Sequence, residues 1–173
     1  MITRAMERRP TSFFSGEQTM GHKKGKKAKQ RKSTECSRCT REGEAFYCFK
    51  KNYVFDVDMA RAFVSDGRES IELEPEDVNY SVDRVEINEG HLAHVDPSIP
   101  GIVAHLYYPA DDGTLVHAHR LIDGHHRASR CRQDKMPFYV YVLSEEESIA
   151  TLIRSPEGST PEHLVGAKVP VLD

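Results

Sequence analysis

The segment Ile102-Val103-Ala104-His105-Leu106-Tyr107-Tyr108, together with residues 115–122, decides the fold of this chain. The first stretch is apolar and rich in residues that favour strands, and the second has the length of a return strand. Residues 109–114 between them include an Asp-Gly pair, whose glycine tolerates the positive φ of a tight turn. We therefore predict a β-hairpin over residues 102–122.

The residues after the hairpin alternate between helix and strand signals. Asp123-Gly124 ends the return strand, and the sequence predicts a helix over residues 125–133. A proline precedes the nearly apolar run 138–143, which we expect to be a central strand of a sheet. Ser144 and Glu147 then have the S-x-x-E spacing of a capping box, so a second helix is predicted to follow.

The segment before the hairpin is less patterned. We predict a short helix that is capped by Asp58 and ends near Gly67. A strand is predicted over residues 82–87, and two prolines, Pro97 and Pro100, mark a linker into the hairpin.

These elements predict an α+β fold: a small mixed β-sheet with helices packed on one face, over residues 57–155. Residues 1–33 are expected to be a disordered basic tail, and residues 34–56 a separate cysteine-containing segment. Residues 156–173 contain three prolines and are expected to form a loosely attached C-terminal tail.

Charge is divided unevenly along the 173 residues. Residues 1–32 hold ten Lys or Arg and two Glu, whereas the remainder is strongly acidic. The densest basic run, residues 23–32, predicts non-specific contact with nucleic acid phosphates through counterion release. A solubilising tail is the alternative, and so is an origin in a vector or an upstream start site, since Met6 and Met20 are also possible starts.

We predict a cytoplasmic chain, because the sequence has no secretory signal and no apolar run long enough to span a membrane. Its four cysteines are then expected to be reduced thiols. Cys36, Cys39 and Cys48 include one C-x2-C pair, which suits tetrahedral zinc. A zinc site needs a fourth ligand, which would be His22 or a distant residue, and free thiols are the alternative. Cys131 is predicted to be a small core residue.

The chemistry is expected where the return strand turns into the helix, at Asp123-Gly124-His125-His126-Arg127. The first amides of a helix have no intrahelical partner and carry the positive end of its dipole, so they can bind phosphate. His126, Arg127 and Arg130 could add charge-assisted bonds to phosphate oxygens. A solvated basic helix after a glycine turn is the alternative interpretation.

The order of segments over residues 99–148 resembles the ParB/sulfiredoxin superfamily, which includes ParB N-terminal domains, sulfiredoxins and free-serine kinases. The resemblance lies in Pro-Gly-Ile-Val-Ala-His-Leu, then Leu-Ile-Asp-Gly-His-His-Arg-Ala, then Pro-Phe-Tyr-Val-Tyr-Val-Leu-Ser-Glu-Glu-Glu-Ser. It implies a ParB/sulfiredoxin-like fold with a nucleoside di- or triphosphate site at the helix start. Gly124 matches the glycine of the family motif, Arg127 its phosphate arginine, and His126 the sulfiredoxin-type histidine.

His125 stands where sulfiredoxins have their catalytic cysteine, so sulfiredoxin chemistry is disfavoured. ParB clamps continue into a helix-turn-helix domain, which we do not expect after residue 155. The closest motif match is the serine-kinase-like branch, in which a carboxylate near the first strand acts as base. Glu86 or Glu89 could hold that place, although the helix usual before the hairpin is missing or very short here.

A metal site competes with the phosphate site. His117 and His119 point to one face of their strand, and with His125 they could bind a divalent ion, as in a metal-dependent nuclease or oxygenase.

The favoured expectation is nucleotide binding (ATP, ADP or CTP) with phosphoryl transfer or nucleotide hydrolysis. Asp123 would then hold Mg²⁺ or orient a catalytic His125. A non-catalytic DNA-associated module is the alternative.

Overall fold

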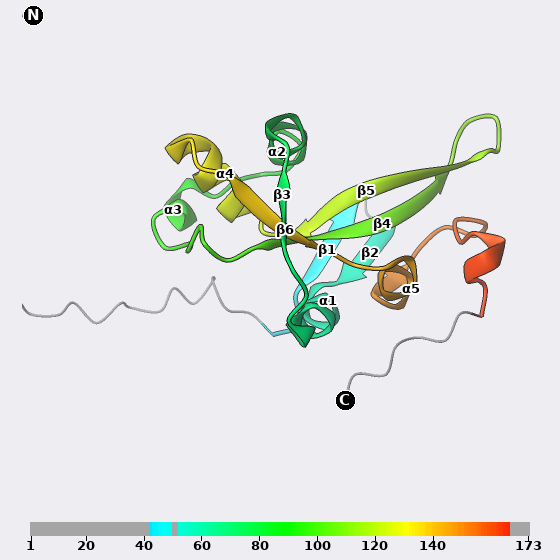
Figure 1. The fold of residues 1–173 in the computed structure, drawn as a ribbon. Coiled ribbons are helices and arrows are strands. Elements are labelled where there is room, and N and C mark those ends of the chain that lie inside the picture. The colour runs from blue at the N-terminus through cyan, green and yellow to red at the C-terminus, as the bar shows by residue number, and fades with distance from the viewer. Residues whose placement is uncertain (1–41, 50–51, 167–173) are drawn as a thin grey trace, which may run out of the picture. The chain divides into compact units, whose positions relative to one another are not determined.

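The structure, a computed structural model, describes residues 42–49 and 52–166. Over these residues the fold is α+β, as predicted, but it contains two β-sheets instead of one (Figure 1). The larger sheet has the strand order β3-β6-β4-β5, and the smaller has the order β1-β2-β7.

The larger sheet is mixed, because β4 pairs with β6 in parallel and the other two pairs are antiparallel. Its strands are β3 (Ile71–Leu73), β4 (Gly101–Pro109), β5 (Leu115–Asp123) and β6 (Phe138–Val142). The pairing of β4 with β5 confirms the predicted hairpin. β6 lies between β3 and β4, which confirms the central strand predicted over residues 138–143.

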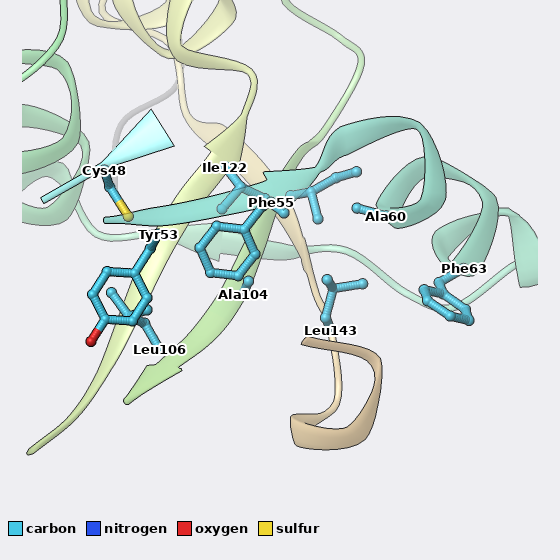
Figure 2. Packing of buried hydrophobic residues seen from close by; sticks show 10 residues of the cluster. Cys48, Tyr53, Phe55, Ala60, Phe63, Ala104, Leu106, Ile122 and Leu143 are labelled. Carbon is cyan, nitrogen blue, oxygen red and sulfur yellow. The ribbon is translucent and has the colours of Figure 1, made fainter. Parts of the chain in front are cut away.

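The smaller sheet was not predicted from the sequence. It consists of β1 (Ala45–Cys48), β2 (Tyr53–Asp56) and β7 (Leu152–Arg154), all antiparallel. Tyr53 and Phe55 are buried in the same core cluster as Ala104, Leu106 and Ile122 of the hairpin (Figure 2). The predicted boundary at residue 57 therefore does not separate two structural units.

The helices cover both faces of the larger sheet, so the prediction that they pack on one face is wrong. They are α1 (Val57–Phe63), α2 (Pro75–Val82), α3 (Glu89–Leu92), α4 (His125–Asp134) and α5 (Glu145–Ala150), with 3₁₀ turns η1 (Val64–Asp66) and η2 (Glu162–Leu164). On β4, Ala104 and Leu106 belong to the cluster that includes α1, whereas Val103 belongs to the one that includes α2 and α4. Because side chains alternate along a strand, these clusters lie on opposite faces. Figure 1 shows α2 and α4 on one side and α1 and α5 on the other.

Two local predictions before the hairpin are wrong. Residues 82–87 do not form a strand, because Val82 is the last residue of α2 and packs with Val78, four residues earlier, against α4. Pro75 at its first position favours α2. We did not predict this helix from the sequence, because we gave weight to the short apolar alternation that begins at Val82. α1 is capped by Asp56 instead of Asp58, and the Asp56 carboxylate accepts a hydrogen bond from the backbone N of Met59 at 2.8 Å.

The C-terminal part is better anchored than expected. Residues 159 and 164 are buried, and η2 brings His163 to within 2.8 Å of a Glu145 carboxylate oxygen. The helix after Ser144 begins with the predicted capping box. Across the described ranges, every helix falls short of the length and apolar character that a membrane crossing requires.

A forked ion pair fastens α5 to the chain before β3. Arg68 Nη1 and Nη2 donate to the two carboxylate oxygens of Glu147 at 2.8 and 2.6 Å. The Glu147 carboxylate is largely buried, and it also accepts a hydrogen bond from the backbone N of Ser144. The bonds from Arg68 outweigh burial and hold the pKa of Glu147 below its usual value.

Glu147→Gln should lower the free energy of unfolding by about 2 kcal/mol, because it removes the more buried of the two carboxylates that pair with Arg68 and leaves only the exposed Asp66. Glu146→Gln makes the same chemical change one residue earlier, at a side chain that does not contact Arg68. We expect that control to shift the denaturation midpoint far less. Equal midpoints for the two variants would contradict a stabilising role for the pair.

Candidate functional site

A cavity of about 300 Å³ lies at the start of α4. Its walls come from the loop before β1, α1, α3 and the segment after it, the end of β5 and the start of α4. The lining residues are Glu44, Arg61, His91, His94, Val95, Asp96, Ile99, Asp123, Gly124, His125, His126 and Arg127.

Gly124 fixes the turn from β5 into α4. Its φ of 98° lies in the left-handed region that favours glycine. A Cβ atom at Gly124 would lie 2.9 Å from the Cα of Gly101 and 3.1 Å from Nη2 of Arg127. The absence of a Cβ at Gly124 therefore lets the start of β4 and the side chain of Arg127 approach the turn.

The start of α4 exposes unpartnered amides to the cavity. Gly124 is the N-cap residue and has no side chain to cap the helix. The first intrahelical bond runs from Ala128 N to Gly124 O, so the amides of residues 125–127 have no intrahelical acceptor. These amides and the positive end of the helix dipole favour a negatively charged ligand.

Two arginines hold the carboxylate of Asp123 beside this helix start. Arg61 Nε and Arg127 Nη2 both lie 3.0 Å from Asp123 Oδ2. Burial acts to raise the pKa of Asp123, but the charge of Arg127 and the bond from Arg61 outweigh it, so the pKa lies below its usual value. Asp123 is therefore ionised at neutral pH and positions two guanidinium groups at the cavity.

The guanidinium of Arg127 has unused hydrogen-bonding capacity. Its Nη2 forms an ion pair with Asp123, but within residues 42–49 and 52–166 neither its buried Nε nor its buried Nη2 has a hydrogen-bond partner of regular geometry. Unsatisfied buried N–H groups are unfavourable, and those of a charged group especially so. Arg127 is thus preorganised for an acceptor that a ligand would bring.

His125 is a neutral imidazole in this environment. Its ring stacks on Phe46 of β1, with centroids 4.9 Å apart and planes inclined by 17°. Burial, followed by the charge of Arg120, lowers the pKa of His125 to about 4. Near neutral pH it can donate one hydrogen bond and accept one, but it carries no charge toward a phosphate.

His126 connects the cavity to α3. Its Nε2 accepts a hydrogen bond from the backbone N of Asn88 at 3.2 Å, so the ring proton lies on Nδ1. Its ring centroid lies 5.3 Å from that of His91. Burial and the charge of His91 lower the pKa of His126.

Carboxylates complete the cavity walls. Glu44 Oε2 accepts a bond from Arg61 Nη2 at 2.8 Å, so Glu44 and Asp123 together orient the guanidinium of Arg61. The Asp96 carboxylate accepts bonds from the backbone N and the hydroxyl of Ser98, and these bonds lower the pKa of Asp96. The cavity therefore combines cationic donors with oxygen acceptors.

The structure brings together some of the predicted site residues and not others. Asp123, Gly124, His125, His126 and Arg127 all line the cavity.

Three other predicted residues do not line it. Arg130 is on the α3 side of α4, where its guanidinium binds Asp134 and the carbonyl of Leu92. Glu86 and Glu89 are exposed near α3, which at four residues is as short as the sequence suggested.

The histidine cluster differs from the predicted set. His117 and His119 are joined by His105 of β4, and one ring nitrogen of each lies within 4.8 Å of the others. His125 is instead held at the start of α4 against Phe46. The prediction that His117 and His119 share one face of β5 is confirmed. The third histidine, His105, lies on the paired strand β4, and a pattern within one strand cannot identify it.

Other predictions fall wholly or partly outside the described residues. Cys36, Cys39 and the basic run 23–32 lie in the part that the structure does not describe, so zinc binding and nucleic acid contact stay predictions. Cys48 and Cys131 are free buried thiols, and burial raises the pKa of Cys48 to about 11. The core position of Cys131, against Ala128 and Val140, was predicted correctly.

Sequence reasoning missed Arg61, Glu44 and the cavity wall between His91 and Ile99. Arg61 looked like an ordinary surface residue of α1, since Asp58 three residues earlier gives it an ion pair within its own helix. The segment before Pro100 looked like a linker because it has no periodicity. The one local signal in this segment was Asn88, a residue type that caps helix starts. Its side chain accepts a hydrogen bond from the backbone N of Gly90 at the start of α3.

Comparison with known proteins found no match among family models, curated proteins or solved structures. The ParB/sulfiredoxin-like assignment stays a prediction.

Gly124→Ala should be markedly more destabilising than Gly113→Ala. Both glycines have positive φ, but a Cβ at Gly113 would meet no atom within 4 Å, whereas one at Gly124 would meet backbone at 2.9 Å. The difference between their unfolding free energies isolates the steric effect, which we expect to be about 1–3 kcal/mol. Similar thermal denaturation midpoints would contradict the close approach of Gly101 and Gly124.

Stability should fall as the pH is lowered from about 6.5 to about 4, and His125 should be a major cause. The unfolded chain binds a proton near the ordinary pKa of 6.5, whereas folded His125 does so only near 4. The unfolded state therefore binds more protons in this window, which lowers the unfolding free energy by up to ~3 kcal/mol.

Urea denaturation at several pH values measures this slope. We expect His125→Gln to reduce it without abolishing it, since burial also lowers the pKa of His105 and His126. His94→Gln, at an exposed position, serves as the control. An unchanged slope in His125→Gln would show that His125 titrates normally in the folded protein.

Proposed function

We propose that the cavity at the start of α4 binds the phosphate groups of a nucleoside di- or triphosphate. The observation that carries this proposal is Arg127, whose buried Nε and Nη2 lack a hydrogen-bond partner in the described part of the chain apart from the ion pair of Nη2 with Asp123. It lies beside the uncapped amides of residues 125–127. A phosphate group offers several oxygens to this set of donors, and guanidinium binds such oxygens in a forked manner.

The acidic residues of the cavity favour a phosphorylated sugar or nucleotide over inorganic phosphate. Glu44 and Asp96 can only accept hydrogen bonds when ionised, and both line the cavity. Ribose hydroxyls are the donors that such carboxylates bind in nucleotide sites. The apolar side chains of Val95 and Ile99 offer a surface for the less polar part of the ligand. A volume of about 300 Å³ suits phosphates and sugar.

The reaction class that this site favours is phosphoryl transfer or nucleotide hydrolysis. Such reactions depend on positioning and on neutralising phosphate charge more than on covalent chemistry by the protein. Arg127 and the helix amides would neutralise charge, and Arg61 would reach the same ligand from α1.

Asp123 does not fit a role as magnesium ligand, because two guanidinium groups already surround its Oδ2. We assign it to positioning the arginines, and we expect any Mg²⁺ to enter bound to the nucleotide. A cytoplasmic location, where nucleotides are abundant, belongs to the same proposal.

Arg127→Lys should weaken nucleotide binding by one to two powers of ten, because lysine keeps the charge but loses the forked donors. Isothermal titration with ADP, ATP and CTP, with and without Mg²⁺, measures the effect. Arg127→Lys should also lower the melting temperature, because an ammonium group does not reproduce the ion pair that Nη2 forms with Asp123 as closely as the guanidinium does.

Arg130→Lys is the matched control. It makes the same change one turn later on α4, at a guanidinium that binds Asp134 and the Leu92 carbonyl and does not line the cavity. It should lose stability but keep its affinity. Equal affinities in the two variants, or no binding of any nucleotide by the natural chain, would overturn the phosphate site. A DNA-associated module would instead show salt-dependent DNA binding that is lost on deleting residues 1–32.

A further inference from the structure

The β4–β5 hairpin carries a second cluster of polar side chains, separate from the cavity at α4. Val103 and Leu121 lie on the face of the hairpin that α4 covers. Farther from α4 along the same face come His105, His117 and His119. His117 and His119 are exposed and His105 is half-buried, so solvent can reach all three rings.

The register of the hairpin brings these histidines together. His105 is directly opposite His119, and their ring centroids are 4.6 Å apart. His117, two residues earlier on β5, is diagonal to His105, and their rings are nearly parallel with centroids 5.0 Å apart. His105 Nδ1 and His117 Nε2 lie 2.7 Å apart. One ring nitrogen from each residue is within 4.8 Å of the other two.

We propose that His105, His117 and His119 form a binding site for a divalent transition-metal ion, with zinc as the reference case. Imidazole nitrogen suits zinc, copper and nickel, whereas Mg²⁺ and Ca²⁺ prefer oxygen ligands. On a tetrahedral ion with metal–nitrogen distances near 2.0–2.1 Å, ligand nitrogens are about 3.3 Å apart. The observed separations, 2.7 Å for the closest pair and at most 4.8 Å, reach this spacing by small side-chain rotations.

The protonation of the cluster supports metal binding. A 2.7 Å contact between two ring nitrogens requires one donor and one acceptor, so a single proton lies between His105 and His117. A metal ion that binds both ring nitrogens would replace that proton.

Neighbouring groups hold the rings in place. The His105 ring hydrogen-bonds the backbone of Leu143, and the backbone N of His105 donates to Ser148 Oγ at 2.9 Å. Histidine ligands usually have such an outer partner, which fixes the ring orientation. Tyr107 stacks on His117 with centroids 4.6 Å apart and planes inclined by 10°. Three protein ligands leave a fourth position for water or a substrate, the arrangement of catalytic zinc sites.

The test uses the full chain carrying Cys36→Ser and Cys39→Ser, so that the C-x2-C pair cannot supply ligands. After treatment with a chelator, the protein is titrated with Co²⁺, followed by its ligand-field absorption, and then with Zn²⁺. We expect one ion per chain, displacement of cobalt by zinc, and a rise in melting temperature with zinc. His117→Ala should weaken binding at least about 100-fold, since it removes a direct ligand.

His163→Ala, an exposed histidine on η2 that contacts Glu145, is the matched control and should bind like the parent. If His117→Ala fails to fold by circular dichroism, His119→Gln replaces it. No cobalt spectrum in the parent, or equal affinity in the triad and control variants, would overturn the proposal. Loss of all binding caused by the two serine substitutions would also overturn it, because it would assign the metal to the cysteines.

Discussion

The structure depends on the close approach of two glycines, Gly101 at the start of β4 and Gly124 at the end of β5. A Cβ at Gly101 would lie 2.8 Å from the carbonyl oxygen of Asp123, and one at Gly124 would lie 2.9 Å from the Cα of Gly101. Only glycine at both positions lets the end of β5 turn sharply beside β4. That turn sets where α4 begins, and therefore where its free amides and Arg127 point. The candidate phosphate site is a consequence of this backbone contact.

The electrostatics of the site follow from the same turn. Asp123 is the last residue of β5, so its carboxylate lies between Arg127, four residues on, and Arg61 of α1. The ion pairs join the larger sheet, α1 and α4 around one oxygen atom. Glu44 extends this network to the loop before β1. The cavity is thus lined by charged groups that are held by one another, which reduces the rearrangement needed when a ligand binds.

The hairpin, α4, β6 and α5 could be predicted because their signals are local: a turn pair, a helix after a glycine, an apolar run and a capping box. The smaller sheet could not, because β2 pairs with β7, far away in the sequence, and each strand is short. The same distinction applies to the sites. Residues 123–127 are contiguous and were identified together, whereas Arg61 and His105 reach their sites through tertiary contacts and strand register, which no local pattern specifies.

The pairing of β2 with β7 has a consequence for how the chain folds. It places Val54 opposite Arg154, about one hundred positions later, which raises the contact order of the domain. During synthesis the β1–β2 hairpin emerges early, and one edge of it stays unpaired until residues 152–154 are available. An open strand edge is a site of aberrant association. The smaller sheet should therefore be completed late, when β7 pairs with β2.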